Sequence, residues 1–138
     1  MKKIKLLDHT ADVGIEVAGG SLAELFEALG EGLGQIICPL KLVSPERTIR
    51  IEVAADSVEN LAVDFLSRLL YVIEVNRFLV HNVSVPCIGD KNVTADVAGE
   101  TYDPARHEWT REVKAVTYHQ LKIEQDGDWW KGRIIFDL

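Results

Sequence analysis

The chain has 138 residues, of which 47% are hydrophobic and 27% are charged, and its formal net charge is −7. This length and composition predict one globular domain, residues 1–138, with a hydrophobic core of its own. The acidic balance argues against direct, strong nucleic-acid binding, which needs a basic face, and the lack of a long apolar segment argues against a membrane protein, so we expect a cytoplasmic protein.

Alternation and helix-capping residues predict strand, helix, strand and helix in the first half of the chain. Residues 13–17 alternate as in a strand with one apolar face. Ser21-Leu22-Ala23-Glu24 has the capping-box pattern, and apolar residues at helical spacing extend the predicted helix over 21–37. Three glycines at positions 30, 32 and 34 are expected to weaken its second half. A strand over 48–53 and a helix over 57–75 follow, with Asp56 and Ser57 as candidate N-caps.

After residue 77 the pattern changes to strands in direct succession. The predicted strands cover residues 78–85, 92–99, 112–124 and 130–136. Strands that follow one another without intervening helices pair antiparallel. The sequence therefore predicts an α+β fold in which two helices pack on one face of a mostly antiparallel β-sheet, as a two-layer sandwich.

Carboxylates stand beside predicted strands at both ends of the chain. Asp8 and Asp12 lie near the start, and Asp137 precedes the free α-carboxylate of Leu138 at the end. Hard cations take several oxygen ligands from carboxylates and carbonyls, so a divalent metal site would form if the fold joins the two ends. Residue types alone favour a plainer interpretation, in which Asp8 and Asp12 form turn hydrogen bonds and Asp137 is solvated. A lone histidine such as His9 is more often structural than a ligand.

Lys114 falls inside the predicted strand 112–124. It is either a charged residue that protects a sheet edge or an exposed contact residue, and the two interpretations stand equal. Elsewhere, no serine lies in a Gly-x-Ser-x-Gly context, and the two cysteines, Cys38 and Cys87, do not form a Cys-x-x-Cys pair. The sequence therefore predicts neither a nucleophilic active site nor a zinc site.

Several segments carry a resemblance to a known family. They are Asp8-His9-Thr10-Ala11-Asp12-Val13-Gly14, Leu66-Ser67-Arg68-Leu69-Leu70-Tyr71, Gly99-Glu100 with Tyr102-Asp103, Arg106-His107, Glu112-Val113-Lys114-Ala115-Val116-Thr117-Tyr118-His119, and Ile135-Phe136-Asp137-Leu138. In this order they span nearly the whole chain, which resembles archease, a small protein family associated with tRNA splicing.

The resemblance implies a non-enzymatic activator of an RtcB-type RNA ligase. Such a ligase joins RNA ends with GTP and divalent metal through a histidine–guanylate intermediate, and archeases promote its guanylylation and multiple turnover. By position, Asp12 and Asp137 would give side-chain oxygens, and Leu138 a main-chain oxygen, to a calcium-like ion, with magnesium or manganese as alternatives. Asp8 and Lys114 would be functional residues at or near this pocket, supported by His9.

Two other classes of function stay open. An autonomous metal-dependent hydrolase would need an open coordination position and a general base near the metal, for which His9 or His119 would serve. A general chaperone-like binding module would need a sizeable exposed apolar patch, which the alternating patterns do not suggest.

Overall fold

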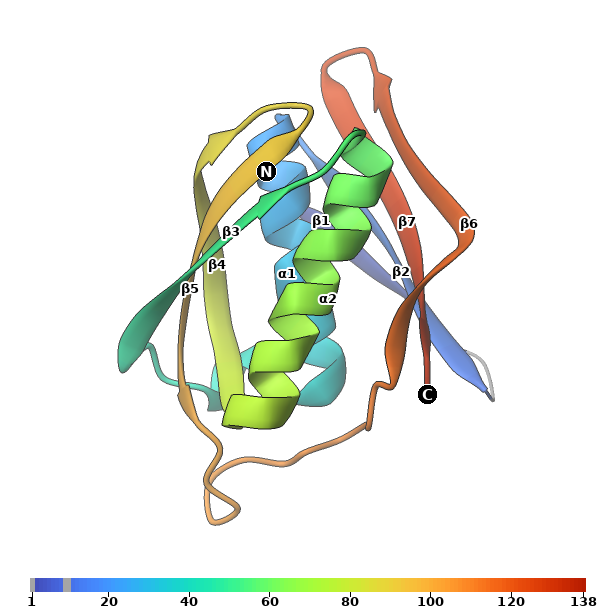
Figure 1. Cartoon of the computed structure of the whole chain (residues 1–138). Coiled ribbons are helices and arrows are strands. Elements are labelled where there is room, and N and C mark those ends of the chain that lie inside the picture. The colour runs from blue at the N-terminus through green and yellow to red at the C-terminus, as the bar shows by residue number, and fades with distance from the viewer. Residues whose placement is uncertain (1, 9–10) are drawn as a thin grey trace.

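A computed structural model describes residues 2–8 and 11–138 of the chain. These residues form seven strands, two α-helices and a short 3₁₀ helix (Figure 1). In chain order the elements are β1 (Lys3–Asp8), β2 (Asp12–Gly19), α1 (Leu22–Ile37), η1 (Leu40–Leu42), β3 (Arg47–Ala54), α2 (Val58–Asn76), β4 (Phe78–Ile88), β5 (Asn92–Thr101), β6 (Ala115–Asp126) and β7 (Trp129–Asp137). None of the helices in these two ranges is long and apolar enough to cross a membrane.

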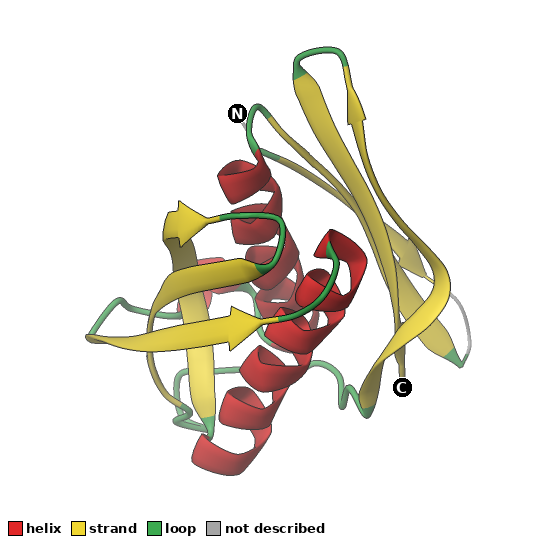
Figure 2. Ribbon diagram, turned by 45° about the horizontal axis from the view of Figure 1, so that its top comes forward, coloured by secondary structure: helices red, strands yellow, loops and turns green. Residues whose placement is uncertain are grey.

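The strands divide between two antiparallel sheets, and the helices lie between them (Figure 2). Sheet A has the order β1-β2-β7-β6 and sheet B the order β3-β5-β4. The α+β class, both helices and the antiparallel pairing are thereby confirmed. The arrangement differs from expectation in one respect: there are two sheets instead of one. Each helix contacts both sheets, since α1 contacts β2 and β4 while α2 contacts β6 and β3.

Helix α1 begins where the capping-box pattern predicts. The Glu24 amide donates to Ser21 Oγ at 3.1 Å, and the Gly20 amide donates to Glu24 Oε1 at 2.7 Å. These two bonds satisfy backbone donors that the first turn of a helix leaves unpaired. The helix then buries apolar side chains on both sides, and Phe26 meets Phe65 of α2 with ring centroids 5.8 Å apart. One hydrophobic core therefore joins the helices to both sheets.

The glycines of α1 do not weaken the helix as expected; they set how closely the sheets approach it. A Cβ on Gly32 would lie 2.7 Å from Cδ1 of Ile15 in β2, and a Cβ on Gly34 would lie 2.7 Å from Cβ of Val80 in β4. Real Cβ atoms do not tolerate such distances, since protein interiors are close-packed. The local helix-propensity cost of these glycines is thus offset by tight packing on opposite sides of α1.

Strand β4 lies at an edge of sheet B, and side chains of α1 cover part of that edge. The Val83 amide donates to Glu31 Oε2 and the Val85 amide to Glu27 Oε2, each at 3.0 Å. Lys2 Nζ lies 3.0 Å from Glu31 Oε2 and 3.5 Å from Glu27 Oε1. Two carboxylates therefore occupy donors that would otherwise pair with another strand.

The close packing of α1 against sheet B predicts that Gly34→Ala destabilises the protein. Alanine favours a helix over glycine by about 1 kcal/mol, but the added Cβ meets Val80, and overpacking costs about 1–3 kcal/mol. Urea denaturation should therefore give a lower free energy of unfolding than for the wild type. The exposed Ser67 in α2 provides the control, because Ser67→Ala adds no atom and should change stability little. A Gly34→Ala variant more stable than wild type would contradict the packing argument.

Candidate metal site at the joined chain ends

The C-terminus lies beside the start of β2, which is near the start of the chain, at one end of sheet A (Figure 1). We call these two segments, residues 11–12 and 137–138, the joined chain ends. Asp12 of β2 stands directly opposite Asp137 of β7 in the antiparallel register. The Leu138 amide donates to the Ala11 carbonyl at 3.2 Å, and the Lys114 amide donates to the Asp137 carbonyl at 2.8 Å. The C-terminus is thus hydrogen-bonded on both sides and does not fray, and the adjacency expected of a shared metal site is observed.

The carboxylates of Asp12 and Asp137 point to the outer face of sheet A. Their neighbours Val13 and Phe136 are fully buried against the helices, and successive strand residues face opposite ways. Cβ atoms of directly opposite residues lie about 4.5–5.5 Å apart. Among the described residues neither carboxylate has a hydrogen bond or an ion pair. Two like charges so placed destabilise a sheet, and a cation bound between them would relieve this repulsion.

The donor set fits a hard divalent ion that keeps open coordination positions. Asp12 and Asp137 offer carboxylate oxygens, and Leu138 offers main-chain oxygens beside them. Within residues 2–8 and 11–138, no group of three or more His, Cys, Asp or Glu side chains is placed to hold a metal. Calcium takes 6–8 oxygens, so water or a partner's oxygens would complete the shell. The expected ligands are brought together, while ion binding itself stays a prediction.

Asp8 lies next to this group and is held by a residue that sequence analysis missed. Arg111 Nη2 donates to Asp8 Oδ2 at 2.6 Å, and this hydrogen bond raises the pKa of the Arg111 guanidinium above its ordinary value. The two residues lie 103 positions apart, and no local pattern connects them. Asp8 stands opposite the buried Val13, so its side chain lies on the inner face of sheet A, whereas Asp12 and Asp137 face outward. A role of Asp8 at the metal pocket stays a prediction, and His9, expected to support the pocket, lies outside the described residues.

Lys114 does not lie in mid-strand as expected. Strand β6 begins at Ala115, opposite Asp137, and Lys114 is the exposed residue just before it. Val113 on its other side is buried in the core, and the Lys114 amide is still bonded to the Asp137 carbonyl of β7. Lys114 lines a hollow of about 320 Å³ with Tyr71 and Glu74 of α2. This placement favours the interpretation as a contact residue over that as an edge-protecting residue.

A buried ion-pair network holds the segment that carries Arg111 and Lys114. Glu100, at the end of β5, is only 5% exposed and accepts hydrogen bonds from Arg106, from the Ser44 amide at 2.7 Å and from His107 Nε2 at 2.9 Å. The Asp103 amide donates to His107 Nδ1 at 2.8 Å, which assigns the imidazole proton to Nε2. These bonds, chiefly those from Arg106, lower the pKa of Glu100 to about 2.

The network explains why residues 102–114 follow one path from sheet B to sheet A. The connection is also bonded to α1, where the Thr110 amide donates to the Ile37 carbonyl at 2.7 Å. Rings of Tyr102 and Trp109 pack edge to face with centroids 5.2 Å apart. The segments around Glu100 and His107 carried the family resemblance but had no predicted role. They position Arg111 and Lys114 beside the joined chain ends.

The lowered pKa of Glu100 predicts a stability that depends on acidity. Glu100→Gln keeps the shape but removes the charge that Arg106 and His107 bond, and should cost about 3 kcal/mol at neutral pH. Since the folded pKa of about 2 lies below the ordinary 4.5, the wild-type advantage is complete above about pH 4.5 and lost as pH falls toward 2. Urea denaturation of both proteins across this range measures it. A difference in stability that is constant with pH would show that the charge is not responsible.

Comparison with known proteins gives one consistent result. Residues 5–138 match the model of the Archease protein family. A protein named archease from Methanosarcina acetivorans is 35% identical over 99% of this chain and 97% of its own length. One from Thermococcus kodakarensis is 36% identical over 94% of each chain.

Solved structures show the same fold. The solution structure of Methanobacterium thermoautotrophicum protein 1598 superposes with a TM-score of 0.80 at 28% identity, over 98% of each chain. An archease from Thermotoga maritima, described as a possible chaperone, gives a TM-score of 0.64 at 24% identity over 97% of this chain and 96% of its own. From the matches in sequence, this chain belongs to the archease family.

Proposed function

We propose that this protein activates an RtcB-type RNA ligase in tRNA splicing by promoting ligase guanylylation and multiple turnover, using a divalent ion held by both chain ends. The observation that carries the proposal is the opposition of Asp12 and Asp137, whose carboxylates have no partner among the described residues. Two like charges directly opposite each other destabilise the sheet, and binding of a cation between them would compensate for this cost. Family membership supports the same conclusion.

The joined chain ends form an exposed acidic edge. This edge would contact the active site of the ligase, which binds nucleotide and divalent metal. Asp12, Asp137 and Leu138 would hold the ion, whose open positions would accept phosphate oxygens. Asp8 stands opposite Val13 on the inner face of the sheet, and its pairing with Arg111 leaves no uncompensated negative charge there. The exposed Lys114, whose amide donates to the Asp137 carbonyl, would contact the ligase or its nucleotide. In this proposal the chain contributes positioning and charge, and the ligase performs the bond chemistry.

A chaperone-like binding module is the second candidate. The sequence patterns did not suggest an exposed apolar patch, yet Ile4 and Leu6 on β1 are 41% and 50% exposed. This surface would suit a protein partner, but it gives no role to the paired carboxylates. Ligase activation accounts for both the partner and the acidic edge, and is therefore preferred.

The proposed metal role predicts that Asp12→Asn and Asp137→Asn each weaken divalent-ion binding and ligase activation together. Each removes one anionic ligand from a site with few others, while relieving carboxylate repulsion, so neither should destabilise the ion-free protein. Calorimetric titration with calcium, magnesium and manganese measures binding, and multiple-turnover ligation by a purified RtcB-type ligase measures activation. Calcium should raise the melting temperature of the wild type but not of the variants.

Asp128, exposed in the turn between β6 and β7, provides the matched control. Asp128→Asn makes the same change in charge away from the chain ends and should leave both readouts unchanged. If the Asp12 and Asp137 variants lose the ion yet activate the ligase at the wild-type level, the ion is structural only. Its proposed place beside the nucleotide would then be wrong, and activation would act through the conformation of the ligase.

Lys114→Ala should abolish ligase activation with little change in stability. The side chain is exposed and has no ion pair among the described residues, so its loss should change the free energy of unfolding by no more than about 0.5 kcal/mol. Lys41→Ala, an exposed lysine in η1, is the control for loss of one positive charge. Retained activation together with a large loss of folding stability would instead make Lys114 a structural residue.

A further inference from the structure

Strand β1 is an open edge of sheet A. It lies at the end of the strand order β1-β2-β7-β6, and five of its six residues are exposed. Ile4 and Leu6 are two of the six large apolar side chains that are exposed among the described residues. They alternate with Lys3 and Lys5, which face the other side of the strand. The edge thus presents backbone donors and acceptors between an apolar row and a basic row.

Two other sheet edges are closed by their own structure. Glu27 and Glu31 of α1 bond amides on the free side of β4 in sheet B. Strand β6, at the opposite side of sheet A from β1, is interrupted between Thr117 and Lys122, where Gln120 has a left-handed backbone with φ of 55°. Bulges of this kind disrupt pairing with a further strand. Strand β1 has no such interruption in its register with β2.

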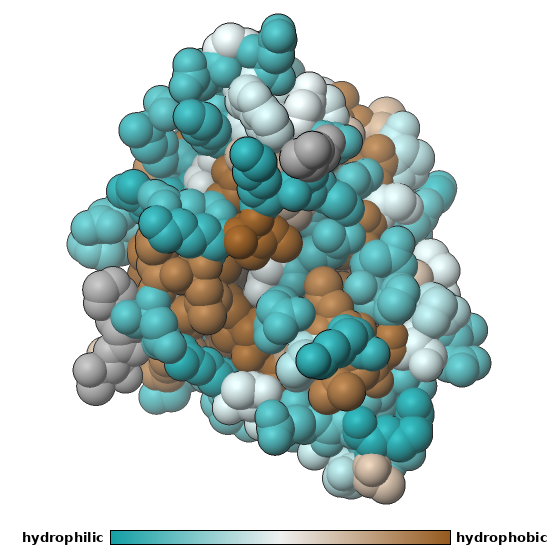
Figure 3. Space-filling model, turned by 180° about the vertical axis from the view of Figure 1, so that it is seen from behind, coloured by the Kyte–Doolittle hydropathy of each residue, from teal (hydrophilic) through white to brown (hydrophobic). Residues whose placement is uncertain are grey.

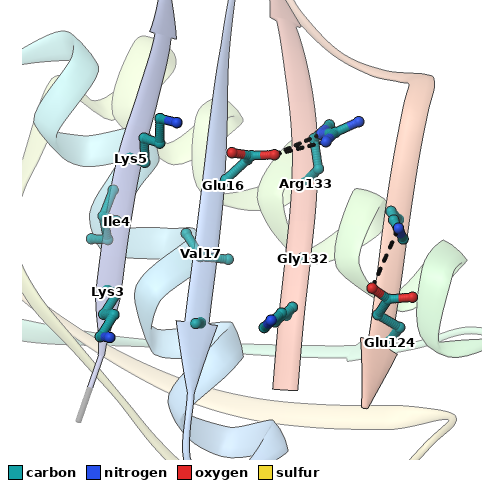
Figure 4. Close-up of a pocket in the computed structure, with 11 residues that line it drawn as sticks. Lys3, Ile4, Lys5, Glu16, Val17, Glu124, Gly132 and Arg133 are labelled. Carbon is teal, nitrogen blue, oxygen red and sulfur yellow. Dashed lines mark hydrogen bonds and ion pairs between the residues drawn. The ribbon is translucent and has the colours of Figure 1, made fainter. Parts of the chain in front are cut away.

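A basic hollow of about 540 Å³ lies across the outer face of sheet A, and β1 forms one side of it (Figure 4). It is lined by five cationic side chains and two carboxylates, a local excess of three positive charges in a chain whose net charge is −7. The cations are Lys3, Lys5, Lys122, Lys131 and Arg133, and the carboxylates are Glu16 and Glu124.

Ion pairs within the sheet leave the two lysines of β1 available. Arg133 pairs with Glu16 at 2.7 Å and Lys122 with Glu124 at 3.3 Å, as the dashed lines in Figure 4 show. Lys3 lies over the Trp129 ring at 4.9 Å, and neither Lys3 nor Lys5 has an ion pair among the described residues. Two cations about 6.6 Å apart along one strand therefore face outward, and Glu16, which stands opposite Lys5, is already paired with Arg133.

A mainly apolar hollow of about 300 Å³ lies on the inner side of β1, beside α1. Leu6, Val13, Ile36 and Pro39 line its apolar part, and Gln35, Glu108, Thr110 and Arg111 line the rest. In Figure 3, which shows the back of the molecule, apolar side chains gather in a hollowed area over β1 and α1. The two faces of the same edge therefore differ in chemistry: the outer face is basic and the inner face is apolar.

We propose that β1 binds an extended segment of a partner protein as a fifth strand of sheet A, with acidic residues facing Lys3 and Lys5 and apolar residues facing Ile4 and Leu6. Alternate side chains of an added strand point to opposite faces, so one segment would place acidic side chains beside Lys3 and Lys5 and apolar side chains beside Ile4 and Leu6. The charge of the outer face selects an acidic segment. A second copy of this chain pairing through its own β1 would bring lysines against lysines, which is destabilising.

This proposal deepens the proposed function, because it gives the surface on which the ligase would be held. Strand β1 ends at Asp8, which is bonded to Arg111 beside the joined chain ends. A partner strand that follows β1 therefore reaches the acidic edge that carries Asp12 and Asp137. Docking on β1 would hold that edge against the partner at the position where the ion is proposed to act.

A peptide titration tests the docking surface without the ligase. The probe is a blocked peptide of alternating valine and glutamate, eight residues long, compared with one in which lysine replaces every glutamate. We expect the acidic peptide to bind the full-length protein in calorimetry, to shift the backbone amide resonances of β1 in NMR spectra, and to bind more weakly at high salt. Equal binding of both peptides, or shifts confined to other elements, would overturn the proposal.

Charge reversal and a polar substitution on β1 sharpen the test. The double variant Lys3→Glu/Lys5→Glu should weaken acidic-peptide binding by about tenfold or more, and Leu6→Thr should weaken it as well. The control for the charge reversal is Lys41→Glu/Lys91→Glu, which makes the same change in net charge. The control for Leu6→Thr is Val75→Thr, at an exposed position of α2. Both control variants should bind the acidic peptide as the wild type does. Circular dichroism verifies that each variant is folded. Sedimentation showing a dimer that dissociates in the Leu6→Thr variant would assign the edge to a second copy instead.

Ligation assays with the same variants separate this proposal from the proposed function. Loss of both peptide binding and ligase activation in Lys3→Glu/Lys5→Glu supports docking of the ligase on β1. Loss of peptide binding with full activation would show that the ligase does not dock there, while leaving the metal role intact. If the wild type binds the acidic peptide through β1 but never activates a ligase, the proposed function fails and the strand-binding edge stands.

Discussion

The packing of α1 between two sheets is the constraint on which the rest of the structure depends. Contact on both sides requires a helix without side chains at the points of closest approach, which Gly32 provides toward β2 and Gly34 toward β4. Strand β2 is thereby fixed against the core through Ile15, and β2 in turn pairs with both β1 and β7. The contact between Gly32 and Ile15 in the interior therefore determines where the acidic edge and the open strand β1 lie.

Register connects core stability to the candidate site. Val13 and Phe136 are fully buried, and their pairing sets Asp12 opposite Asp137 on the other face. A slip of one residue between β2 and β7 would turn an aspartate toward the helices and an apolar side chain toward water. The same apolar contacts that stabilise the fold therefore hold two like charges together. A site built in this way keeps its geometry without any bond between its own ligands.

Local signals predicted the elements, and long-range contacts decided what those signals leave open. The capping box at Ser21 and the N-cap residue Ser57 predicted where both helices begin. Such caps can be recognised in a sequence because they involve residues three positions apart. The division into two sheets depends on which strands pair, and this is not visible in a local pattern. The glycines of α1 showed a cost in helix propensity but did not indicate which strands pack against them. Arg111 had no signal at all, since its partner is remote in sequence. The joined ends were expected from resemblance; residue types alone favoured solvated carboxylates.

The asymmetry between the edges of sheet A limits what this molecule can assemble. Fibre growth by strand addition needs two accepting edges on each unit, so that every newcomer offers a place for the next. Here β1 accepts a strand, whereas the bulge at Gln120 interrupts β6 on the far side. A unit of this kind terminates a chain of strands and does not extend it. Under the proposed strand addition the molecule is therefore monovalent through sheet A, with one partner strand bound by each copy of this chain.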